Sequence, residues 1–324
     1  MFGGLVNMSE HIAYVNYKSL VTVVLIALLT LAFLVYVSPS LSASSTWYSQ
    51  SLSTSSITPA TYENYYYDPH IPQEGQRVVC IVFDDGWKTP YTNALPILDQ
   101  YGFKATFAVV PYFVENYSGY MNWDQIVTLH NQGHDIESHS LDHPHLPAQT
   151  TTTIDYQLLQ SKQELLKYGI NAPIFVYPFG EGVGNSDIEQ LVQQHYSVAR
   201  SIKEGSLDMS QPFNPYALPA YEIRNSTTME MFKNYVDQAN NSTIVILFYH
   251  QISDGAVYTS AEIENFAAQM QYLHDNNFDV HTMKQLFFTS TESSIASGWF
   301  ILTTNNVRLN DKIPVLCGKT RLTP

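Results

Sequence analysis

The chain has 324 residues, of which 45% are apolar and 13% aromatic, enough to bury a large core and to exclude wholesale disorder. Only 14% of the residues are charged, and 29 acidic against 15 basic residues give a formal net charge of -14. Such a charge repels phosphate backbones and anionic headgroups, so the composition argues against a nucleic-acid partner. Low charge combined with many Tyr, Ser and Thr residues is typical of secreted or cell-surface proteins.

An uncharged apolar run near the N-terminus predicts a membrane anchor. Residues 19–37 are long enough to cross a hydrocarbon layer of about 30 Å. Lys18 precedes this run and the next charged residue is Glu63, a bias that keeps the preceding segment in the cytoplasm. We therefore expect a short cytoplasmic N-terminus over residues 1–18, a transmembrane helix over 19–37 and a single-pass cell-membrane protein whose remainder is extracellular.

Two other interpretations of this run stay open. Small residues at Ser40, Ser42 and Ala43 are compatible with a signal-peptide cleavage site, in which case the protein is secreted after cleavage. A buried core helix is the third interpretation. Beyond the run, 14 of the 24 residues over 38–61 are Ser or Thr. This composition predicts an extracellular Ser/Thr/Tyr-rich linker over residues 38–76.

In the segment 77–288, short β-branched runs alternate with amphipathic stretches, which predicts an α/β domain with parallel strands and crossover helices. Seven strands are expected, a number close to that of a barrel. We assign no role to the tail over residues 289–324. The expected strands are residues 78–83, 105–110, 135–138, 174–177, 197–200, 244–249 and 278–281, and the expected helices lie within 89–102, 122–133, 153–168, 186–195, 228–239 and 260–276.

Two adjacent carboxylates end the first expected strand of this domain. Asp84 and Asp85 stand in the sequence Phe-Asp-Asp-Gly, at a tight turn where neighbouring side chains point in different directions. One of them can bind a metal ion while the other handles a proton. His250 directly follows the sixth expected strand, where an imidazole can donate a proton to a leaving group.

Two histidines follow the third expected strand. His139 and His143 are four residues apart and share a face if their loop makes a helical turn. Two imidazoles and one carboxylate leave a fourth metal position open for water, which is typical of hydrolytic rather than structural metal sites. Active sites of such folds lie where the C-terminal ends of the strands meet, so we expect these residues to converge.

These motifs, taken in order, resemble those of the polysaccharide deacetylases with a NodB-homology domain, carbohydrate esterase family four. The likeness spans about two thirds of the chain. It implies a distorted (β/α) barrel that removes N-acetyl groups from amino-sugar residues of a polysaccharide. The four matching segments are Phe83-Asp84-Asp85-Gly86, His139-Ser140-Leu141-Asp142-His143, Tyr177-Pro178-Phe179-Gly180 and Leu247-Phe248-Tyr249-His250.

The resemblance implies a metal site and an acid and base. Asp85, His139 and His143 would hold a divalent cation, with Asp84 as the base and His250 as the acid. Zn²⁺ suits these ligands best, although imidazole and carboxylate groups also accept Co²⁺, Ni²⁺ or Mn²⁺. The implied reaction is hydrolysis without a covalent intermediate.

The resemblance also implies how the substrate is held. The N–H of Phe179 would face the oxyanion, while Tyr177 and Pro178 would shape the groove. Leu247 would line an apolar pocket for the acetyl methyl group. The implied partner is an N-acetylated polysaccharide, and the sequence makes no prediction of the oligomeric state.

The chain departs from the family at two points. The third motif of the family usually carries an Arg that orients the base, and Val176 stands in its place here. Arg200, at a strand end, and Arg224 are candidate substitutes between which the sequence does not choose. The family also has a motif between its third and its last, normally built around Asp and Trp, and this motif is not recognisable after Gly205.

Two alternatives to a polysaccharide deacetylase stay open at this point. One is a membrane-tethered carbohydrate-binding protein that has lost turnover, which the missing Arg at Val176 motivates. The other is an amide hydrolase acting on a non-sugar N-acyl compound, which the same site chemistry allows.

Overall fold

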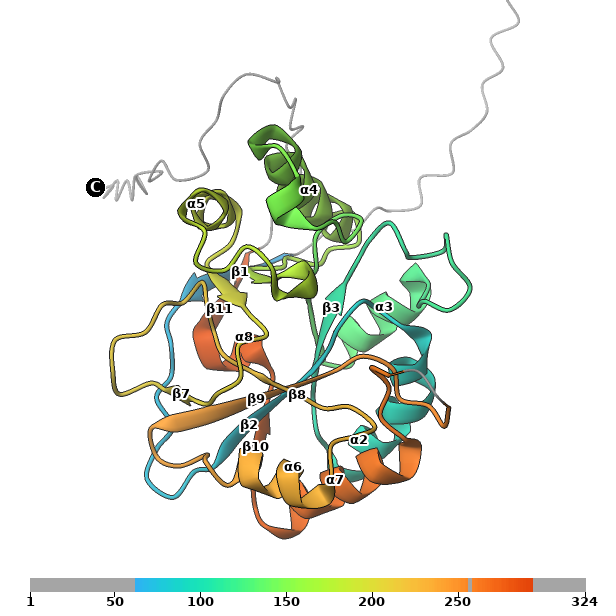
Figure 1. Cartoon of the computed structure of the whole chain (residues 1–324), viewed down its shortest axis with the longest axis vertical. Helices are drawn as coiled ribbons and strands as arrows, with labels where there is room; N and C mark the ends of the chain where they lie inside the picture. Colours follow the sequence, from blue (N-terminus) through green and yellow to red (C-terminus); the bar gives the residue numbers. More distant parts are fainter. Residues whose placement is uncertain (1–61, 256–257, 294–324) are drawn as a thin grey trace, which may run out of the picture. The chain divides into compact units, whose positions relative to one another are not determined.

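The computed structural model describes residues 62–255 and 258–293 (Figure 1). The predicted cytoplasmic segment and anchor, residues 1–37, lie outside the described residues, as do most of the predicted linker and residues 294–324 of the tail. Within the described part, no helix is long and apolar enough to span a membrane.

A nine-stranded sheet organises the domain, and it contains the seven strands expected from the sequence. Its members are β2 (Val78–Phe83), β3 (Thr106–Val109), β4 (Asp135–Ser138), β5 (Ile174–Val176), β6 (Val198–Arg200), β7 (Leu207–Asp208), β8 (Tyr221–Glu222), β9 (Thr243–Tyr249) and β10 (Asp279–His281). The order is β6-β5-β4-β3-β2-β9-β7, with β10 also beside β2 and β8 also beside β9. Every pair is parallel except β7 with β9. The predicted α/β class is therefore confirmed.

The sheet curls into a half-barrel, and the chain that follows β6 spans its open side. The N–H of Ala199 donates to the carbonyl of Pro215 at 2.8 Å, and the N–H of Leu218 donates back to Ala199 at 3.0 Å. This segment continues into β8, where Tyr221 pairs with Leu247 of β9. The C-terminal ends of the parallel strands consequently gather around one opening.

Strands β2 and β9 are buried on both faces, as central strands of a parallel sheet usually are. Ile81 and Leu247 belong to one phase of the alternation and pack with the helices in one apolar cluster. Cys80 and Phe248 belong to the other phase and pack inside the curl. The alternation therefore decides which side chains can reach the opening.

Helices connect the strands and begin and end at recognisable signals. The side chain of Asn122 accepts a hydrogen bond from the N–H of Gln125 in a capping box, and Gly102 ends a helix with φ 68°. In Figure 1, α4 and α5 lie side by side, and α7 lies beside α2 and α6. The helices are the π-helical turn η1 (Pro90–Ala94), α2 (Leu95–Tyr101), α3 (Trp123–Asn131), α4 (Thr151–Leu166), α5 (Ser186–His195), α6 (Met229–Val236), α7 (Ile263–Asp275) and α8 (Met283–Phe287), with short 3₁₀ turns η2 (Leu146–Ala148) and η3 (Pro178–Gly180).

Strands β1, β7, β8 and β11 and helix α8 were not expected. β1 (Tyr62–Tyr67) lies in the predicted linker and pairs antiparallel with β11 (Phe288–Ser293), which runs into the predicted tail. Helix α8 brings Lys284 to 2.8 Å from a carboxylate oxygen of Asp135 and 3.2 Å from one of Glu137, both in β4. The ordered structure thus extends beyond both ends of the segment 77–288.

Candidate metal and catalytic site

The turn after β2 separates the two adjacent carboxylates. The N–H of Asp84 continues the strand pairing by donating to the carbonyl of Tyr249 at 2.8 Å. Asp85 and Gly86 then adopt φ values of 71° and 78°. A non-glycine residue in this left-handed region is uncommon and often marks a functional constraint. Asp85 Oδ2 accepts a hydrogen bond from the indole N–H of Trp87 at 2.8 Å, which fixes the direction of the other oxygen.

The loop after β4 holds the two histidines without the helical turn that their spacing suggested. Ser140 and His143 have φ values of 63° and 62°, and the N–H of His143 donates to Ser140 Oγ at 3.0 Å. Gln157 of α4 reaches into the loop and accepts hydrogen bonds from the N–H groups of Leu141 and Asp142, each at 3.1 Å. Side chains of the loop and of α4, rather than helical geometry, therefore set the position of His143.

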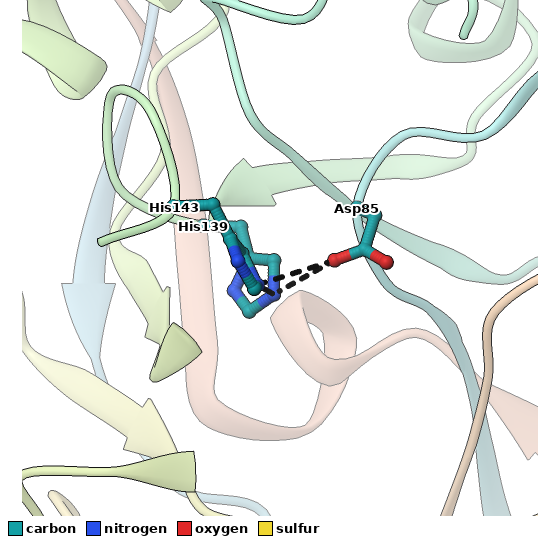
Figure 2. Close-up of side chains that lie close together, drawn as sticks. All are labelled: Asp85, His139 and His143. Carbon is teal, nitrogen blue, oxygen red and sulfur yellow. Dashed lines mark hydrogen bonds and ion pairs between the residues drawn. The ribbon is translucent and has the colours of Figure 1, made fainter. Parts of the chain in front are cut away.

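Asp85, His139 and His143 converge on one point, as Figure 2 shows. Asp85 Oδ1 lies 3.4 Å from His139 Nε2 and 3.3 Å from His143 Nε2, and the two Nε2 atoms are 3.1 Å apart. This is the cluster with metal-ligand spacing that is found among the described residues.

The surroundings of His139 fit a metal ligand. His139 Nδ1 lies 2.7 Å from the carbonyl oxygen of Val176, which can only accept, so Nδ1 carries the proton and the Nε2 lone pair faces the cluster. A lone pair this close to another imidazole nitrogen and a carboxylate oxygen is favourable when a cation lies between them. One carboxylate and two imidazoles are also the donor set of catalytic zinc sites.

The protonation states in the cluster suit a metal as well. Burial alone would raise the pKa of Asp85, but the contact with His139 and the nearby imidazoles of His250 and His143 outweigh burial and lower it. Burial, with the neighbouring His139, lowers the pKa of His143 to about 4. At neutral pH the cluster therefore presents an ionised carboxylate and a neutral His143 imidazole, the forms that bind metals.

Asp84 lies beside the cluster and is paired with a buried guanidinium. The side chain of Arg200 is fully buried, and its Nη2 makes a short ion pair with Asp84 Oδ2. Its Nη1 donates to the carbonyl of Ser201 at 3.1 Å, and the guanidinium carbon lies 4.4 Å from the centre of the Phe248 ring. Arg224, the other candidate, pairs instead with Glu222. Of the two arginines, only Arg200 contacts Asp84 among the described contacts.

His250 lies at the end of β9 with a carboxylate partner that the sequence did not indicate. Its Nδ1 is 3.7 Å from Glu222 Oε1, and Glu222 comes from the two-residue strand β8. In the sequence, the segment around Glu222 offers Arg224 as a candidate and gives no sign of Glu222. A strand of two residues leaves no alternation to recognise, so this pairing could not be found from the sequence.

The third motif forms the turn η3 at the edge of the site. Tyr177 and Pro178 are buried, whereas Phe179 is 46% exposed and has φ 56°. Phe179 contacts the cluster directly, because its ring centre lies 4.4 Å from that of His143.

The prediction for Leu247 needs correction. Leu247 is fully buried among the side chains that face the helices, and it does not line the opening. Phe248, one residue later on β9, faces the inside of the curl and lines the cavity. Because the side-chain period of a strand is two residues, a displacement of one residue changes the face completely.

A single cavity of about 320 Å³ joins these groups. It holds the carboxylate pair, the candidate metal-ligand histidines, His250 with Glu222, and the turn η3. Its lining residues are Asp84, Asp85, His139, His143, Tyr177, Phe179, Gly180, Ile202, Glu222, Arg224, Phe248, His250 and Thr259.

The candidate metal donors and proton-transfer groups lie at the C-terminal ends of parallel strands, where the active sites of α/β enzymes are found. Residues 72–197 match the family model of the polysaccharide deacetylases. The resemblance predicted from the motifs is therefore confirmed for this segment of the chain.

Individual relatives are distant. YxkH of Bacillus subtilis (strain 168), named for the polysaccharide deacetylases, is 24% identical over 163 residues, which are 50% of this chain and 57% of that protein. The chain thus spans little more than half of this relative.

The solved structures that resemble the chain are distant from it as well. The Xyl-CE4 domain of a xylanase from the Trinervitermes trinervoides hindgut metagenome is 18% identical, with a TM-score of 0.48 over 65% of this chain and 90% of that one. The Streptococcus pyogenes deacetylase PplD in complex with acetate is 23% identical, with a TM-score of 0.44 over 48% and 68%.

Proposed function

We propose that this chain is a metal-dependent hydrolase that removes N-acetyl groups from amino-sugar residues of a cell-surface or extracellular polysaccharide. The observation that carries the proposal is the meeting of the three metal donors Asp85, His139 and His143 with Asp84 and His250 in one cavity. A water molecule and an acetamide group both fit within about 320 Å³.

A divalent cation held by the three donors, with zinc favoured by ligand type and cobalt, nickel or manganese also suited, would polarise the acetamide carbonyl and acidify water. Asp84 takes the proton of the attacking water, and Arg200 keeps its carboxylate in place. The N–H of Phe179 donates to the developing oxyanion. His250, oriented by Glu222, protonates the departing amine.

Loss of the metal donors is expected to abolish acetate release. The full-length chain is incubated with N-acetylglucosamine oligomers, and acetate is measured with and without a chelator. His139→Ala and chelation should each lower the rate at least about 100-fold, because general-base and metal contributions act on the same water. Asp142→Ala, an exposed residue of the same loop, is the matched control and should keep its activity.

Other outcomes separate the alternatives. Acetate release that resists chelation and His139→Ala would contradict the metal-dependent hydrolysis. Binding of several acetylated polymers without release of acetate would favour the carbohydrate-binding protein. Turnover of simple N-acyl amines in preference to sugars would favour the amide hydrolase.

Glu222→Gln is expected to lower kcat about 10-fold with little change in KM, because the amide no longer orients a cationic His250. Steady-state acetate release on the same oligomers measures both constants. Glu230→Gln, an exposed glutamate on α6, is the control. An equal fall in both variants would argue against a specific role for Glu222.

We also propose that the domain acts outside the cell on a tether formed by the apolar run 19–37. The support is the length of this run and the charge bias around Lys18. Protease treatment of intact cells should remove the catalytic domain and leave an N-terminal fragment in the membrane fraction. A domain found only in the culture medium would favour a cleaved signal peptide.

A further inference from the structure

His145 lies just beyond the second metal-ligand histidine and does not face the metal cluster. Its ring stacks on that of Phe179, with centroids 4.0 Å apart and an interplanar angle of 8°. Its Nδ1 is 2.9 Å from Glu181 Oε2. The exposed imidazole is thus held by Phe179 of the turn η3 and by Glu181, the residue that follows this turn.

Phe179 adopts a backbone conformation that needs such support. Its φ of 56° lies in the left-handed region, which a bulky residue rarely occupies without constraint from its surroundings. Nearly half of its side chain is exposed, so burial does not fix it. Its ring is instead flanked by His145 and by the edge of His143.

The other side of the turn is closed by Ile202. A Cβ atom added at Gly180 would lie 2.1 Å from Ile202 Cγ1, so the backbone of the turn packs directly on this side chain. Hydrogen bonds inside the turn employ the N–H groups of Gly180 and Glu181, which donate to Tyr177 and Pro178 at 3.0 Å each. The N–H of Phe179 has no partner among the described hydrogen bonds and stays available to a ligand.

We propose that His145 is a positioning residue for the reaction: held by Glu181, its ring keeps the strained Phe179 backbone in the conformation that directs the Phe179 N–H at the reacting carbonyl. The proposal rests on the proposed function. It assigns His145 neither a metal nor a proton-transfer role. A displaced N–H weakens binding of the transition state more than binding of the substrate, so the effect falls on kcat.

Two variants separate stacking from imidazole chemistry. His145→Ala removes the stack, whereas His145→Phe retains an aromatic ring without nitrogen atoms. In the full-length chain, we expect His145→Ala to lower kcat about 10-fold, with KM within about twofold of the wild type. Removal of a whole oxyanion donor lowers kcat by about 10²–10³, and a displaced donor should have a smaller effect. His145→Phe should restore kcat to within about threefold of the wild type. His274→Ala is the matched control, because His274 is also exposed, contacts a carboxylate and packs on an aromatic ring.

Amide hydrogen exchange provides a readout that does not depend on turnover. The Gly180 and Glu181 amides should exchange at least about 10-fold faster in His145→Ala and at the wild-type rate in His145→Phe. Unchanged exchange and kcat in His145→Ala would overturn the proposal. Restored exchange with no recovery of kcat in His145→Phe would also overturn it, because the imidazole itself would then be needed. If the wild type releases no acetate from any substrate, the proposed function and the catalytic part of this proposal both fail. Amide hydrogen exchange would still test whether the ring of His145 stabilises the turn.

Discussion

Replacing Arg200 with Met is expected to reduce kcat/KM at least about 100-fold and to lower the free energy of unfolding by about 3–5 kcal/mol. The buried carboxylate of Asp84 would lose the only cation that contacts it among the described residues, and an unpaired buried charge is costly. Urea unfolding and steady-state acetate release measure the two effects.

A double variant separates stability from catalysis. Asp84→Asn combined with Arg200→Met removes both charges, so it should recover most of the stability lost in Arg200→Met and none of the activity. Arg224→Met serves as the stability control, because its pair with Glu222 is partly exposed and should contribute about 1 kcal/mol or less. If Arg200→Met were no less stable than Arg224→Met, the Asp84–Arg200 pair would make no net contribution to the free energy of unfolding.

The convergence of the candidate metal donors could be predicted from the sequence because each follows a buried strand. Asp85 lies two residues after the apolar run that forms β2, His139 directly follows the buried strand β4, and parallel strands bring their C-terminal ends together. The spacing of His139 and His143 suggested that they lie together, which they do, but not through the helical turn that this spacing indicated. Left-handed residues and the side chain of Gln157 bring them together, and neither leaves a pattern in the sequence.

The choice between Arg200 and Arg224 required the fold. Arg200 ends β6, four strands from β2 in the sheet order, and only the curl brings it to Asp84. The prediction that Leu247 lines the opening was wrong for a different reason. The composition of a fully apolar strand does not indicate which alternate residues face the opening. Counting two residues back from His250, which lines the opening, gives Phe248.

The strand pair at the ends of the domain was missed because its residues are polar and far apart in the chain. β1 contains Tyr, Glu and Asn, and β11 contains mostly Thr and Ser, so neither shows the apolar alternation of a half-buried strand. Their register, from Tyr62 with Ser293 to Tyr67 with Phe288, is a long-range pairing. A composition that looks like a linker thus forms an edge structure once its partner is present.

Lys284→Met is expected to lower the free energy of unfolding by about 3–5 kcal/mol while leaving the metal site intact. Lys284 is 8% exposed and lies 2.8 Å from Asp135 and 3.2 Å from Glu137, near the N-terminal ends of the strands. Burial opposes its charge, but the two carboxylates outweigh burial and raise the pKa of Lys284. The methionine would leave both acids without this cation.

The fall in the free energy of unfolding caused by Lys284→Met should depend on pH, because Glu137 titrates. Burial, followed by the charge of Asp135, raises the pKa of Glu137 in the folded state above its unfolded value, so its protonated form is favoured by folding. The stability that this contributes is present below the unfolded pKa and falls as the pH rises towards the folded pKa. Because Lys284 opposes this shift, Lys284→Met raises the pKa of Glu137 further. The destabilisation measured by urea titration should therefore be larger at pH 8 than at pH 5.

Lys104→Met is the matched control, because Lys104 pairs with Asp99 at 3.6 Å and both side chains are partly exposed. This variant should lower the free energy of unfolding by less than about 1 kcal/mol, and this change should show no comparable dependence on pH. If both variants lowered the free energy of unfolding equally, the attraction between Lys284 and its two carboxylates would only offset the cost of burying these charges. In that case, apolar packing around Met283 and Phe287 would be what fixes α8 to the sheet.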